Sequence, residues 1–165
     1  MQRISPFVFD LAGSLPQAVA QGGTVREAKQ STFPALAGNA LAVYLVTLEP
    51  GAVRIPHWHP DASELDYCLQ GKAQFGLSSP GGEWESFDLE PGQISLIPQG
   101  WFHYFQNTGG DPLRMLVAFN NSDPNDIGIS IGFQAIPPDV LGTTFGVPAE
   151  RFQGLDLNVR YIAPQ

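Results

Sequence analysis

The sequence has little cysteine and no long apolar run, and each shortage excludes a class of protein. A single cysteine, Cys68, excludes an intramolecular disulfide and gives no evidence for an oxidising compartment. No apolar run approaches the ~20 residues that a transmembrane helix needs, and the opening MQRISPFVFD lacks the apolar core of a signal peptide. We therefore expect a cytoplasmic protein that does not enter a membrane.

Basic residues are also scarce. Eight lysines and arginines stand against 16 aspartates and glutamates, which gives a net charge of −8. This surplus argues against nucleic acid and anionic membrane surfaces as partners. An anionic ligand would need a local cation to bind.

Glycine and proline are abundant, with 18 and 15 copies in 165 residues, and they favour short strands joined by tight turns. The length fits one domain. We expect residues 1–39 to be an N-terminal arm with weak strands at 7–11 and 24–29, residues 40–120 a barrel core, and residues 121–165 a loop and flank with a short helix in 137–146. Both flanks are expected to pack outside the barrel or against another subunit. Core strands are predicted at 40–48, 64–71, 72–78, 83–89, 93–97, 101–107 and 112–120, the spacing of an all-β sandwich or barrel.

Two of the three histidines lie one residue apart in GAVRIPHWHPDASELDYCLQG. Residues i and i+2 of a strand share a face, so His57 and His59 can point at one place. The turn formers after them can bring Glu64 back beside both imidazoles. His103 lies in a second segment, PGQISLIPQGWFHYFQN.

Together these segments read Gly51-x5-His57-x-His59-x4-Glu64-x6-Gly71 and Gly92-x5-Pro98-x-Gly100-x2-His103-x3-Asn107. This pattern resembles the two-part motif of the cupin superfamily at every position. The resemblance implies a double-stranded β-helix, or jelly-roll barrel, with one metal held by the counterparts of His57, His59, Glu64 and His103. Three imidazoles and a carboxylate suit a divalent transition metal. Manganese(II) is the first expectation and iron(II) the second, while zinc, nickel and copper are compatible.

The stretches GGTVREAKQSTFPAL, LVTLEPGAVRIPHWH and FNNSDPND followed by PPDVL resemble the oxalate decarboxylase branch of that superfamily, whose members fuse two such domains. In that branch an arginine three residues before the first ligand histidine holds the substrate carboxylate, and Arg54 occupies this position. In an unbroken strand a spacing of three would turn Arg54 away from His57, so we expect Pro56 to bend the chain. The alternative is a surface arginine.

The branch also supplies a proton donor from a glutamate on a mobile lid. NNSDPND contains no glutamate, so Asp123 and Asp126 are the candidate acids, with Asp126 alternatively a structural turn residue. Alternation along the strand after Glu64 sends Asp66 inward, as a general base or a residue that orients the ligands, unless a bulge turns it out.

Three functions remain open. The first is a manganese-dependent enzyme acting on a small carboxylate, with oxalate the best candidate. The second is an iron or nickel dioxygenase, and the third is a binding or storage cupin without catalysis. The resemblance also implies a homo-oligomer, a dimer or larger.

Overall fold

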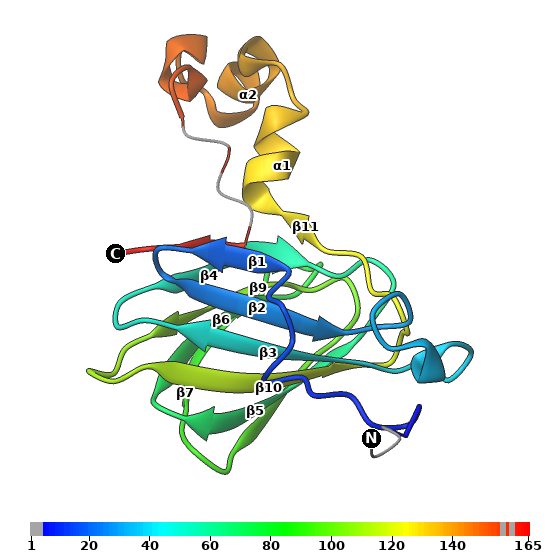
Figure 1. Cartoon of the computed structure of the whole chain (residues 1–165). Coiled ribbons are helices and arrows are strands. Elements are labelled where there is room, and N and C mark those ends of the chain that lie inside the picture. The colour runs from blue at the N-terminus through cyan, green and yellow to red at the C-terminus, as the bar shows by residue number, and fades with distance from the viewer. Residues whose placement is uncertain (1–4, 156–157, 159–160) are drawn as a thin grey trace.

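A computed structural model describes residues 5–155, 158 and 161–165. Within these residues the chain forms two six-stranded sheets that pack face to face as a jelly-roll barrel (Figure 1). The first sheet has the order β1-β2-β3-β10-β5-β8, and the second has the order β11-β4-β9-β6-β7 with β12 paired to β4. This is the all-β barrel that the spacing of strands and turns predicts.

The predicted core strands all form, within two residues of their predicted ends. The strands are β1 (Ala18–Ala20), β2 (Gly23–Ala28), β3 (Ala42–Leu48), β4 (Val53–Trp58), β5 (Glu64–Gln70), β6 (Ala73–Ser78), β7 (Trp84–Leu89), β8 (Ile94–Ile97), β9 (Phe102–Asn107), β10 (Leu113–Phe119), β11 (Ile127–Gly128) and β12 (Ile162–Ala163).

The N-terminal flank is part of the barrel. β2 pairs along its length with β3, so the first sheet continues into residues that we expected outside it. The predicted strand at 24–29 is β2, whereas the described part of the chain forms no strand at 7–11. Residues 7–11 contain backbone turns, including Val8 N–H to the Ser5 carbonyl at 3.1 Å, instead of a ladder.

Short helices follow the barrel strands and stand clear of the sheets (Figure 1). α2 (Pro138–Phe145) has proline in its first turn, as predicted, and ends at Gly146 in the left-handed conformation. α1 (Ile129–Gln134) and the 3-10 turns η1 (Pro34–Leu36) and η2 (Ala149–Phe152) complete the elements. No helix among the described residues is both long enough and apolar enough to cross a membrane.

The core lies between the two inner faces. Every second residue of the regular strands points inward, so β3 contributes Val46 and Leu48, β6 contributes Phe75, and β9 contributes Phe105. The apolar packing gives way to buried polar side chains at one place, where β2, β3, β4, β5, β9 and β10 surround a cavity.

Candidate metal centre

Four buried side chains converge at one place, His57, His59, Glu64 and His103, and the first three of them line the cavity. Their ligand atoms all lie within 4.8 Å of one another, and each side chain is at most 3% exposed. Glu64 Oε2 lies 2.9 Å from His59 Nε2 and 3.2 Å from His103 Nε2. The structure thus brings together the four residues that the motif assigned to a metal.

Strand pairing places these ligands. His57 lies opposite His103 in the β4–β9 pair, Glu64 begins β5, and His59 follows the end of β4. Backbone N–H of Gly100 donates to the His59 carbonyl at 2.9 Å, which ties the chain before His103 to the chain after β4. We call these four residues the ligand cluster.

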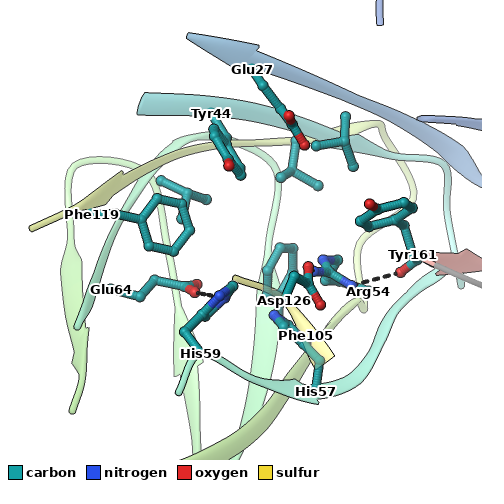
Figure 2. Close-up of a pocket in the computed structure, with 13 residues that line it drawn as sticks. Glu27, Tyr44, Arg54, His57, His59, Glu64, Phe105, Phe119, Asp126 and Tyr161 are labelled. Carbon is teal, nitrogen blue, oxygen red and sulfur yellow. Dashed lines mark hydrogen bonds and ion pairs between the residues drawn. The ribbon is translucent and has the colours of Figure 1, made fainter. Parts of the chain in front are cut away.

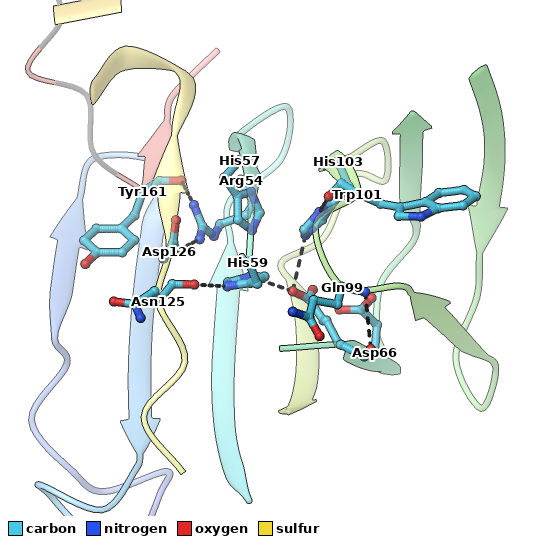
Figure 3. Close-up of polar contacts among 12 residues, drawn as sticks. Arg54, His57, His59, Asp66, Gln99, Trp101, His103, Asn125, Asp126 and Tyr161 are labelled. Carbon is cyan, nitrogen blue, oxygen red and sulfur yellow. Dashed lines mark hydrogen bonds and ion pairs between the residues drawn. The ribbon is translucent and has the colours of Figure 1, made fainter. Parts of the chain in front are cut away.

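Backbone carbonyls fix the proton position of all three imidazoles. In His57, Nδ1 lies 2.7 Å from the Ile55 carbonyl. Nδ1 lies 2.6 Å from the Asn125 carbonyl in His59 and 3.0 Å from the Trp101 carbonyl in His103 (Figure 3). A carbonyl oxygen only accepts, so each Nδ1 carries the hydrogen and each neutral ring leaves the Nε2 lone pair free. This is the tautomer that a metal ligand needs.

The charges in the cluster also fit a cation. Burial opposes ionisation of Glu64, but the charges of His103 and His59 hold the pKa of this carboxyl well below its ordinary value. Burial, together with the charge of Arg54, holds the pKa of His57 well below that of a free imidazole. His59 is buried, yet its proximity to Glu64 raises its pKa. Among the described residues, His59 Nε2 makes no hydrogen bond, although it is buried. One carboxylate and inward lone pairs form a donor set for a divalent metal ion.

Arg54 reaches the same cavity because β4 carries a bulge. The β4–β9 register shifts between Arg54 and His57, so that three steps along β4 match two along β9. Both side chains therefore face inward despite their odd spacing, and Arg54 is 5% exposed. The bend expected at Pro56 is present, and Arg54 is not a surface arginine.

The Arg54 guanidinium is already bound to a carboxylate of the same chain. One amino group forms a partly buried ion pair with Asp126, and the other donates to the Tyr161 carbonyl at 3.2 Å (Figures 2 and 3). The guanidinium carbon lies 5.3 Å from the centre of the Tyr161 ring. Asp126 is thus at the cavity, as the sequence indicated, but its carboxylate neutralises Arg54 here.

The other two candidate acids lie outside this cavity. Asp123 is exposed and pairs with Lys29 at 3.4 Å. Asp66 points inward as alternation predicts, is fully buried, and accepts a hydrogen bond from the Ser95 hydroxyl at 3.0 Å. Burial and the neighbouring Glu64 charge raise the pKa of Asp66 well above its ordinary value. Its position beside Glu64, behind the cavity, favours the orienting role over that of a general base.

Sequence reasoning missed several residues of the cavity. Glu27 and Tyr44 enter from β2 and β3, Phe119 from β10 and Tyr161 from near the C-terminus (Figure 2). Alternation in GTVREA, which places Val25 and Glu27 on one face, was a signal for Glu27. Asp61 was also missed. Its carboxylate accepts hydrogen bonds from the backbone N–H of Asn125 at 3.0 Å and from the Asn125 side-chain amide at 2.6 Å. These bonds hold the loop whose Asn125 carbonyl orients His59.

Known proteins with the same features agree on one family. The family model described as Cupin matches residues 10–153. Oxalate decarboxylase OxdC of Bacillus subtilis is 31% identical over 80% of this chain and 34% of its own length. Spherulin-1A of Physarum polycephalum is 30% identical over 86% of this chain and 58% of its own, and germin-like protein 3-8 of Oryza sativa is 32% identical over 78% and 59%.

Solved structures give the same result. A structure that addresses the Mn(II) centres of Bacillus subtilis oxalate decarboxylase superposes with a TM-score of 0.87 and 25% identity, over 95% of this chain and 41% of that one. A structure of the same decarboxylase at pH 4.6 gives a TM-score of 0.86 and 26% identity, over 94% of this chain and 40% of that one. The chain therefore spans between one third and three fifths of these relatives. The matched motif, the fold and the ligand cluster establish that this chain belongs to the cupin family.

Proposed function

We propose that this chain is a metal-dependent enzyme acting on a small carboxylate, with oxalate as the substrate and manganese(II) as the metal. The observation that carries the proposal is Arg54, a buried guanidinium that lines the same cavity as the ligand cluster and already binds a carboxylate, that of Asp126. It provides the local cation that a chain of net charge −8 needs to bind an anion. Relatives named as oxalate decarboxylases support the choice of substrate.

The roles of the residues follow from their positions. His57, His59, Glu64 and His103 would hold the metal, and a divalent cation there would polarise a carboxylate and, as manganese, provide redox chemistry. Arg54 would bind and orient the substrate carboxylate in place of Asp126. Phe119, Val117 and Val46 line the cavity and exclude water from it.

The cavity is small in this structure, about 20 Å³, which is room for about one water molecule. A substrate with two carboxylates therefore enters only after Asp126 leaves Arg54. Asp126 lies just before β11, where Ile127 pairs with Trp58 and Gly128 with His57, so movement of the preceding loop would open the cavity. A closed site that admits only a small anion fits oxalate better than a large substrate.

A binding or storage cupin is the second candidate. Two features favour it: the absence of glutamate from residues 120–126, and the occupation of Arg54 by Asp126. Such a protein would hold the metal and the carboxylate without turning the carboxylate over.

The test is carbon-13 NMR of labelled oxalate incubated in air with protein of confirmed manganese content. Labelled formate is expected. Arg54→Ala should abolish it while retaining the metal, and Arg151→Ala, an exposed arginine, should not. Oxalate that binds and stays unchanged would overturn the enzymatic proposal in favour of the binding protein.

A further inference from the structure

One buried acid of the cavity has no part in the roles described above. Glu27 lies on β2 opposite Tyr44 of β3, and both side chains line the cavity. Figure 2 shows Glu27 and Tyr44 across the cavity from His57 and His59. We call Glu27 and Tyr44 the acid side of the cavity.

Glu27 is poorly satisfied for a buried carboxyl group. Its side chain is 5% exposed, and Oε2 makes no hydrogen bond within the described part of the chain. Lys29 Nζ lies 3.2 Å from Oε2, which is ion-pair distance without hydrogen-bond geometry. Oε2 is therefore held by an ion pair alone, and buried polar atoms without a hydrogen bond are uncommon.

The surroundings of Glu27 raise the pKa of its carboxyl group. Burial raises the pKa of this carboxyl, and the charge of Asp126 adds to the effect, while Lys29 and Arg54 oppose it only in part. Tyr44, whose own pKa is raised by burial, stays neutral beside it. A protonated carboxyl group can donate a proton into the cavity.

Glu27 also has a route to solvent. A second, more open cavity of about 320 Å³ is lined by Glu27, Lys29, Asp123 and Asp126, among others. Lys29 Nζ lies between Glu27 and Asp123. The exposed fraction of the side chain is 5% in Glu27, 23% in Lys29 and 44% in Asp123. Glu27 therefore separates the inner cavity from a charged path to the surface.

The other acids near the site are engaged elsewhere. Of the acids that line the inner cavity in residues 5–155, 158 and 161–165, Glu64 belongs to the ligand cluster and Asp126 binds Arg54. Asp123 points to Lys29 at the surface. Glu27 is the acid of the inner cavity that remains, and its ion-pair partner is Lys29, which is partly exposed.

We propose that Glu27 is the catalytic acid of this site and delivers a proton to the carboxylate bound by Arg54. The inference rests on the proposed function. In decarboxylation of oxalate the C–C bond breaks, carbon dioxide leaves, and the retained carboxylate carbon takes one proton, so that oxalate dianion and a proton give formate and carbon dioxide. Glu27 supplies this proton and regains it from solvent through Lys29 and Asp123.

The test compares Glu27→Gln with Glu85→Gln, an exposed glutamate on β7. Wild-type protein and Glu85→Gln should form formate at equal rates. Glu27→Gln should retain manganese and oxalate binding but form formate about 100-fold more slowly, the usual contribution of a general acid. Lys29→Met should slow formate production and shift its pH profile, because it removes both the residue through which Glu27 regains its proton and the cation that lowers the pKa of Glu27.

A second readout needs neither metal nor substrate. Infrared difference spectra of the metal-free protein during a pH titration should show the band of a protonated carboxyl group that Glu27→Gln lacks and Glu85→Gln retains. If the wild type forms no formate, the proposed function fails. If the wild type forms formate and Glu27→Gln does so at a similar rate, Glu27 is not the acid and the proposed function still stands.

Discussion

The ligand cluster and the acid side of the cavity differ in how the chain brings their residues together. His57, His59 and Glu64 lie within one strand–turn–strand segment, and His103 joins them through one strand pair. Glu27 and Tyr44 come from separate strands and meet through the β2–β3 register. The ligand cluster is held by backbone carbonyls at each imidazole, whereas an oxygen of Glu27 has no hydrogen bond among the described residues. The ligand cluster therefore has a fixed geometry, whereas we expect the acid side of the cavity to release a proton.

The largest effect is expected from a substitution that removes the negative charge of the ligand cluster. Glu64→Gln keeps the shape of the side chain but loses the carboxylate, so metal affinity should fall by at least about 100-fold, beyond the cost of losing an outer partner of a ligand. Calorimetric titration with manganese measures the loss, and Glu90→Gln, an exposed residue, is the matched control. Unchanged manganese affinity in Glu64→Gln would show that the Glu64 carboxylate does not bind the metal.

The next variant separates metal binding from carboxylate binding. Arg54→Met fills a similar volume without charge, so manganese content should stay the same while oxalate binding weakens about 100-fold. The variant should also lose about 3 kcal/mol of stability, because it leaves Asp126 partly buried without its partner. Calorimetry and thermal melts measure these effects. Loss of manganese together with oxalate would contradict independent roles.

A smaller effect is expected from the loop that orients His59. Asp61→Ala removes both hydrogen bonds to Asn125, so the Asn125 carbonyl should hold His59 Nδ1 less firmly. Metal affinity should fall about 10-fold, as expected when an outer partner of a ligand is lost. Asp139→Ala, exposed on α2, is the control. If both variants bind manganese equally well, the loop has no role in ligand orientation.

The smallest expected effect is on the pH dependence of stability, to which Glu27 of the acid side contributes. The pKa of Glu27 is raised in the folded protein, so the folded state binds more protons than the unfolded state, and stability falls as pH rises from about 4.5 through the folded pKa. Glu27→Gln should lose this component of the slope and gain stability relative to wild type above that pH. Thermal melts of the metal-free proteins across pH measure the difference. Parallel curves of stability against pH for the two proteins would show that folding does not raise the pKa of Glu27.

Much of the barrel and the ligand cluster could be predicted from the sequence because both depend on short-range patterns. Alternation and turn residues marked the core strands, and a fixed motif marked His57, His59, Glu64 and His103. Alternation also predicted the inward position of Asp66.

The acid side could not be predicted in this way, because the pairing of β2 with β3 is a long-range contact that no local pattern fixes. Tyr161 was missed for the same reason, since it reaches Arg54 from near the C-terminus, where β12 pairs with β4. Asp126 was found, but its partner was not: the ion pair with Arg54 depends on the path of the loop before β11.

The bulge in β4 has a consequence for engineering. Because the bulge accommodates one extra residue between Arg54 and His57, deleting a residue at 55 or 56 would leave a spacing of two, which a regular ladder accepts with both side chains still facing inward. The ligand residues after the deletion would keep their own spacing. The bulge is thus a place where the length of β4 can change by one residue without turning Arg54 or the ligand histidines to the outer face.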